Sequence, residues 1–238
     1  MKKSHALQDV DKVNQPFQSY NNQLGELTRS ILEMGDLVQQ MIGAAHESLT
    51  AKTDALKDQV RELDQRVNAL DRSVSEQATL MLALRSPMGD DLRFVTSALR
   101  IASDLERAGD LAKNTTKRSL KLGNYSPAAV FGALNQMVQI VRSMVGDALI
   151  AIETRNPEQA LSVWKRDKQV DDLYHDILRG LQEEMQKHPE AVESATHFVF
   201  AAKNFERIAD YATSLARTVH YVTTGTPPGK DVLKAHKE

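Results

Sequence analysis

Two pairs of acidic residues stand at matching places in the two halves of this 238-residue chain, Glu106–Asp110 (ERAGD) and Glu206–Asp210 (ERIAD). Residues four apart lie on the same face of a helix, so each pair would present two carboxylates together. Carboxylate oxygens are the ligands that hard cations such as magnesium, calcium, manganese and iron prefer. One such pair is ordinary in a helix, whereas two at matching places indicate a duplicated unit that kept its acids.

The elements that carry these acids read as helices throughout. Apolar residues recur at spacings of three and four, as in the run Leu56, Val60, Leu63, Val67, Leu70 and Val74. This is the period of one face of an α-helix, and no stretch alternates with period two for long enough to predict a strand. We therefore expect an all-α fold.

Glycine and proline divide the chain into six expected helices. The first spans Leu24–Leu49, and a short break near 51–53 precedes a second that runs to about Arg85. Ser86-Pro87 is expected to open the third helix, with proline in the first turn, where its missing N–H costs nothing. The segment 123–127 separates the third and fourth helices, and Asn156-Pro157 and His188-Pro189 make the next two breaks.

The halves match beyond the acidic pairs. A shift of 103 positions pairs Met34 with Met137, Gly43 with Gly146 and Asp64 with Asp167, and in the third helix the shift becomes 100. Such a repeat predicts two tandem antiparallel three-helix bundles related by internal duplication, over residues 20–122 and 127–224. The segments 1–19 and 225–238 are expected to be flexible tails.

Residue counts on either side of each turn predict that acids of two neighbouring helices lie at the same level along the bundle. Asp64 lies 22 residues before Ser86, and Glu106 and Asp110 lie 20 and 24 residues after it. Antiparallel helices rise 1.5 Å per residue on both arms, so these acids should be level. The second half repeats the arrangement around Pro189 with Asp167, Asp171, Glu206 and Asp210.

Carboxylates that converge at a groove repel one another, and a divalent or iron-type cation would relieve that repulsion. Zinc is the poorer choice, because the chain has no cysteine and no histidine near these acids. Two alternatives need no metal. Arg107 and Arg207 could neutralise the acids as salt bridges three residues apart, or the acids could form a solvated face.

Composition excludes several functions. The chain has no cysteine, which favours a reducing compartment. Its net charge of −2 and its 5% aromatic residues do not suggest a nucleic-acid-binding surface. We expect neither a signal peptide nor a membrane-spanning helix, and so a cytoplasmic protein that reaches a membrane only through partners. Neither a glycine-rich phosphate loop nor a nucleophile motif is present, so we expect no enzyme.

The motifs resemble those of the PhoU family of accessory regulators of phosphate-specific transport, over about residues 17 to 225. The matching segments are Ile31–Val38, Leu84–Pro87, Asp91–Arg93, Ser103–Asn114, Lys203–Ser214 and Val222–Gly225. The resemblance implies metal clusters on the E/DxxxD motifs of both bundles. Carried over by position, the ligand candidates are Asp64, Glu106, Asp110, Asp167, Asp171, Glu206 and Asp210, and Asn68 stands where the second half has Asp171.

The resemblance also implies a function. Such proteins act as non-enzymatic negative regulators, homodimeric and cytoplasmic, that couple the ATPase subunit of the phosphate ABC transporter to a phosphate-sensing histidine kinase. Two other classes compete with this reading. A metal-storage or redox bundle would call for Glu-x-x-His motifs, which this chain lacks, and in a passive structural bundle the acids would only confer solubility.

Overall fold

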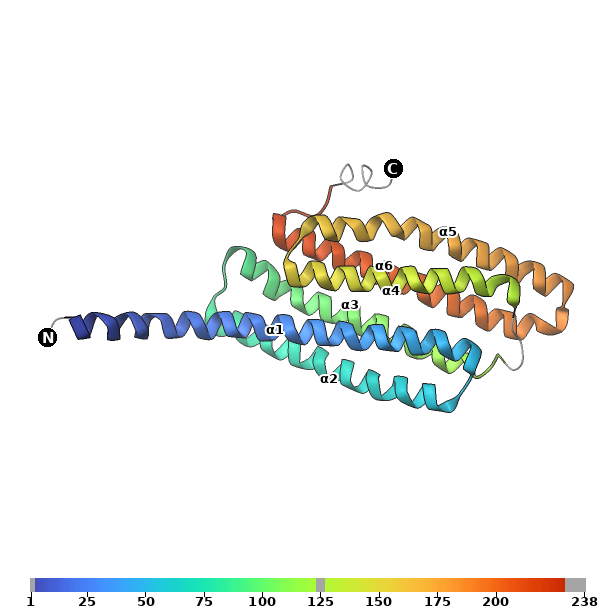
Figure 1. Cartoon of the computed structure of the whole chain (residues 1–238), viewed down its shortest axis with the longest axis horizontal. Helices are drawn as coiled ribbons and strands as arrows, with labels where there is room; N and C mark the ends of the chain where they lie inside the picture. Colours follow the sequence, from blue (N-terminus) through green and yellow to red (C-terminus); the bar gives the residue numbers. More distant parts are fainter. Residues whose placement is uncertain (1–2, 123–126, 230–238) are drawn as a thin grey trace.

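The structure, a computed structural model, describes residues 3–122 and 127–229 and is all-α over these residues, as the sequence predicted. Its helices are α1 (Lys3–Ala51), α2 (Asp54–Arg85), α3 (Gly89–Ser119), α4 (Ala128–Thr154), α5 (Pro157–Lys187) and α6 (Val192–Thr224), and the short 3₁₀ helix η1 (Pro189–Ala191) precedes α6. Helices α1–α3 form one antiparallel bundle and α4–α6 the other (Figure 1). The two bundles lie side by side, with α1 against α4 and α3 against α6.

The helix ends follow from local sequence. The Asn156 side chain accepts hydrogen bonds from the backbone N–H groups of Glu158 and Gln159, and Pro157 is the first residue of α5. The expected start of the third helix was wrong. Ser86 takes a left-handed conformation (φ 47°) that ends α2, because a residue before proline is disfavoured in the helical region, and α3 begins only at Gly89.

The first helix is much longer than expected. It begins at Lys3 rather than Leu24, so residues 3–19 are helical where the sequence suggested a flexible tail. Pro16 lies within this helix without ending it, although proline disfavours a helix interior, and the first glycine of the chain is Gly25. Figure 1 shows this part of α1 extending alone past the turn between α2 and α3. Of the predicted tails, residues 1–2 and 230–238 lie outside the described residues.

The two halves pack about an approximate twofold axis. A Cβ placed on Gly43 of α1 would lie 3.7 Å from the Arg142 guanidinium carbon of α4, and one on Gly146 would lie 3.6 Å from the Gln39 amide oxygen. Gln39 and Arg142 are related by the same 103 positions as the two glycines. The duplication in sequence is therefore also a symmetry of the interface.

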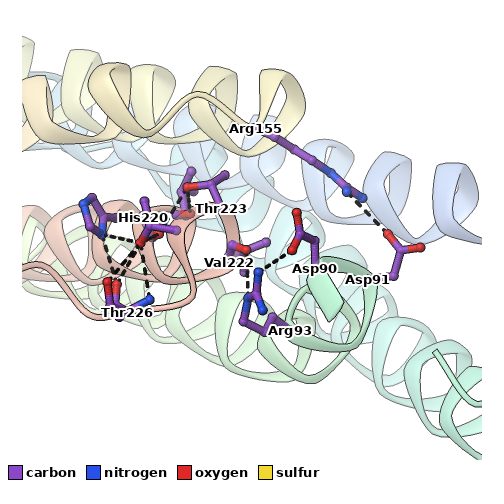
Figure 2. Close-up of polar contacts among 10 residues, drawn as sticks. Asp90, Asp91, Arg93, Arg155, His220, Val222, Thr223 and Thr226 are labelled. Carbon is purple, nitrogen blue, oxygen red and sulfur yellow. Dashed lines mark hydrogen bonds and ion pairs between the residues drawn. The ribbon is translucent and has the colours of Figure 1, made fainter. Parts of the chain in front are cut away.

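Two arginines tie the bundles together at one end (Figure 2). Arg93 of α3 pairs with Asp90 and donates through Nε to the Val222 carbonyl oxygen of α6 at 3.0 Å. Arg155, which ends α4 in a left-handed conformation, reaches Asp91 at 3.4 Å. Both contacts cross between the halves, so the bundles have a fixed relative position here.

Candidate acidic sites on α2–α3 and α5–α6

In the first bundle, acids of two helices meet around one ammonium group. Lys113 Nζ lies 2.8 Å from Asp64 Oδ1 on α2 and 2.5 Å from Asp110 Oδ1 on α3. The Asn68 amide donates weakly to Asp64 Oδ2 at 3.5 Å. Asp64 is buried, although a carboxylate is seldom buried without a partner. The structure thus brings Asp64, Asn68 and Asp110 together, and it puts a cation of the chain itself between the two acids.

Glu106 belongs to the same site, where its carboxyl is affected by the charges of neighbouring acids. Burial, and then the neighbouring charges of Asp110 and Asp71, raise the pKa of the Glu106 carboxyl. Burial lowers the pKa of the Lys113 ammonium, but its bonds to Asp110 and Asp64 outweigh that effect and the net shift is upward. Asp71 of α2 is a further acid at this site that the sequence did not suggest.

The second bundle concentrates more negative charge. Burial raises the pKa of Asp210 to about 6, and the charges of Glu206, Asp167 and Asp171 add to the rise. The other three acids expected here are therefore close enough for their charges to act on Asp210. Lys203 is the cation of this site, with Nζ 2.6 Å from Glu206 Oε2. That oxygen is buried, so this ion pair is shielded from water on the Glu206 side.

Sequence reasoning missed the two lysines. It considered Arg107 and Arg207 as neutralising partners, yet Lys113 pairs with Asp64 and Asp110, and Lys203 pairs with Glu206. The sequence spacing could have suggested these pairs, because Lys113 follows Asp110 by three positions and Lys203 precedes Glu206 by three. The duplication could not reveal them, because the matching positions hold Thr213 and Ser103.

As they stand, the acids are not arranged as a metal centre. The described residues include no group of three or more His, Cys, Asp or Glu side chains placed to hold one metal ion. At each site a lysine ammonium is paired with carboxylate oxygens that a metal ion would need as ligands. Metal binding at these sites stays a prediction, and it requires the two lysines to move away.

Comparison with known proteins decides the family. The model of the PhoU domain matches the chain twice, over residues 31–119 and 134–219, once in each bundle. The chain belongs to the PhoU family. Each PhoU domain contributes one of the two acidic sites, on its second and third helices.

Curated relatives extend over nearly the whole chain. A phosphate-specific transport system accessory protein PhoU homolog of Rhizobium meliloti is 36% identical over 211 residues, 88% of this chain and 89% of the relative. The homolog of Caulobacter vibrioides is 35% identical, over 87% of this chain and 90% of its own.

A crystal structure of PhoU from Pseudomonas aeruginosa aligns with a TM-score of 0.82 and 33% identity, over 87% of this chain and 100% of that one. A second, from Streptococcus pneumoniae, aligns with a TM-score of 0.80 and 28% identity. The six-helix PhoU architecture is thus shared. None of the helices in the described part of the chain has the length and apolar character needed to cross a bilayer.

Proposed function

We propose that this chain is an accessory regulator of phosphate-specific transport. The observation that carries the proposal is the double match to the PhoU domain, one per bundle, together with relatives of nearly equal length that bear this name. A match to a fragment or to a single repeat would support the function less strongly, because a shared fold alone does not imply a shared function. Regulation by binding, without catalysis, agrees with the absence of any nucleophile or phosphate-loop motif in the sequence.

The finer proposal concerns partners. The chain is a cytoplasmic, homodimeric negative regulator that joins the ATPase subunit of the phosphate ABC transporter to a phosphate-sensing histidine kinase. Support comes from the family resemblance and from an apolar surface at the turn between α2 and α3. Leu84 and Met88 are 73% and 82% exposed there, beside Pro87. Large apolar side chains gathered at one exposed place are typical of a protein contact.

Metal binding is the remaining part of the proposal. The donors at both sites are oxygens, which suit a divalent or iron-type cation, and the lysine ammonium of each site holds the place of a cation. Such an ion would displace Lys203 and bind Asp167, Asp171, Glu206 and Asp210. In the first bundle it would displace Lys113 and bind Asp64, Glu106 and Asp110, where Asn68 brings an oxygen but no charge.

A reporter strain tests the regulatory role. Deleting the gene should derepress an alkaline phosphatase reporter in medium with plentiful phosphate, and returning the intact gene should repress it again. An unchanged reporter in the deletion strain would remove the negative-regulator proposal.

The double variant Glu106→Ala, Glu206→Ala tests whether the acids have a role beyond solubility. If they only confer solubility, this variant should repress the reporter fully.

A separate measurement tests the metal. Elemental analysis of protein purified without chelator should find a bound divalent or iron-type cation that is lost from the Glu206→Ala, Asp210→Ala variant. Finding none would remove the metal proposal while leaving the regulatory one intact.

Co-purification from phosphate-replete cells should recover the transporter ATPase, and recovery of neither proposed partner would count against the adaptor role.

A further inference from the structure

A cavity of about 620 Å³ lies between α3 and the C-terminal end of α6, away from both acidic sites. Its walls combine cationic, hydroxyl and apolar side chains, contributed by Ser97, Arg100, Arg217, Thr218, Tyr221, Pro227 and Pro228. The volume is within the range of sites that hold small organic molecules. Among the described lining residues there is no acid.

The two arginines come from different helices and leave positive charge at the cavity. The Arg100 side chain is 69% exposed and its Nη2 donates to the Ser214 hydroxyl at 3.3 Å. Arg217 is exposed, and its guanidinium lies 5.9 Å from the centre of the Trp164 ring. Neither head group is tied into a short carboxylate pair by these contacts, so both retain donors for a ligand.

One acid lies behind this cavity and has to be counted. Asp104 Oδ2 accepts a hydrogen bond from the Ser214 hydroxyl at 2.7 Å and is 3.9 Å from Arg100 Nε. Its side chain is only 13% exposed, and burial raises the pKa of its carboxyl. One recessed carboxyl against two guanidiniums leaves a positive balance, and Asp104 with Ser214 serves to orient Arg100.

Part of the cavity wall is built by the chain after α6. Gly225 ends that helix in the left-handed region (φ 77°), and its N–H bonds to the Tyr221 carbonyl at 2.9 Å. The Thr226 carbonyl oxygen then lies 3.2 Å from His220 Nδ1 and 3.0 Å from the Thr224 hydroxyl that donates to it (Figure 2). These contacts hold Pro227 and Pro228 at the cavity, where two rings without N–H groups form an apolar wall.

We propose that this cavity binds a phosphorylated small molecule of nucleotide size. Planar guanidinium groups match phosphate oxygens in paired hydrogen bonds, so Arg100 and Arg217 would hold the phosphoryl part from two sides. The Tyr221 ring, 38% exposed, and the two prolines would contact the organic part. A free phosphate ion would leave most of this volume and the whole apolar wall without contact.

The site is separate from the regulatory and metal proposals and stands or fails independently of them. Isothermal titration calorimetry of the full chain with ADP should give saturable binding with a Kd below about 1 mM. The variant Arg100→Gln, Arg217→Gln should bind ADP at least about tenfold more weakly, because the charged hydrogen bonds to phosphate are lost. Arg179→Gln, an exposed arginine on α5, is the matched control and should bind ADP as the parent chain does.

Two further ligands resolve which chemistry is recognised. Adenosine should bind far more weakly than ADP, and inorganic phosphate should also bind more weakly, because each offers only half of the proposed contacts. Trp164, the one tryptophan of the chain, lies under Arg217 and gives a second readout through an ADP-dependent change in fluorescence. No saturable ADP binding, equal ADP binding by the double variant, or inorganic phosphate binding as tight as ADP would each overturn the proposal.

Discussion

Lys113 of α3 bonds across the groove to Asp64 of α2, with 2.8 Å between Nζ and Oδ1. The same ammonium reaches Asp110 at 2.5 Å, so a residue of the chain does at this site what a bound cation would do. Asp64 is buried, and removing its partner would leave a carboxylate with reduced access to water. The Lys113 ammonium therefore neutralises these acids, and a metal bound here as proposed would have to compete with it for the same oxygens.

Replacing Lys113 tests this competition. Without metal, Lys113→Met should lower the free energy of unfolding by about 1–3 kcal/mol, because Asp64 loses a charged hydrogen bond. Added Mn²⁺ should recover more stability in this variant than in the parent chain, since no ammonium has to leave. Urea unfolding with chelator and with Mn²⁺ measures both effects. Lys57→Met removes an exposed lysine paired with Asp54 and should change stability little; an equal loss there would contradict the prediction.

The second site should make stability depend on pH. The folded-state pKa of Asp210 is about 6, above the ordinary 3.8, so the folded chain binds this proton more tightly than the unfolded chain. This contribution is fully present below pH 3.8 and is lost as pH rises through 6. In chelator, Asp210→Asn should thus raise the melting temperature at neutral pH, and the gain should shrink as pH falls toward 4. Asp176→Asn on α5 controls for the loss of one exposed charge, and a pH-independent gain would refute the assignment.

Two helical glycines should respond in opposite ways to replacement by alanine, because only Gly35 lies in the close contact between α1 and α4. A Cβ on Gly35 would lie 2.3 Å from Leu149 Cδ2 and 2.9 Å from its Cγ, in a buried place, so Gly35→Ala should cost about 1–3 kcal/mol despite the better helix propensity of alanine. Gly132 has no atom within 4 Å of such a Cβ, so Gly132→Ala should stabilise by about 0.5–1 kcal/mol. Thermal unfolding of both variants measures the difference, and a gain for Gly35→Ala would show that the helices do not pack this closely.

Asn68 sets the two sites apart. It faces Asp64 in the first bundle, whereas the second bundle has Asp171 at the matching position. Asn68→Asp should tighten Mn²⁺ binding at the first site by about tenfold, because an added carboxylate raises the charge of the ligand set. Without metal the same change should destabilise the chain through like charges four residues apart. Mn²⁺ titration measures the gain, and Asn114→Asp, exposed on α3, should leave the affinity unchanged.

Helical period and turn residues were sufficient to predict six helices, their pairing into bundles and the height at which the acids meet. They did not predict the side chains that meet there, because Lys113 reaches Asp64 through a long flexible stem whose direction depends on neighbouring helices. The N-terminal part of α1 was missed because the search for helices relied on an apolar period, which began only at Leu24. Residues 225–229 were expected to be a flexible tail, yet Gly225 and Thr226 fix them as a cavity wall through bonds that spacing does not reveal.

The approximate twofold axis has a consequence for how the two halves can diverge. Where identical subunits meet, every substitution appears on both sides at once, so an acid near the axis would face its own copy. Because one chain encodes both halves, Asp104 can bond to Ser214 while the matching Asn204 donates to Thr115 at 3.0 Å. Covalent linkage has released the two repeats from self-complementarity, and each can specialise without altering its twin.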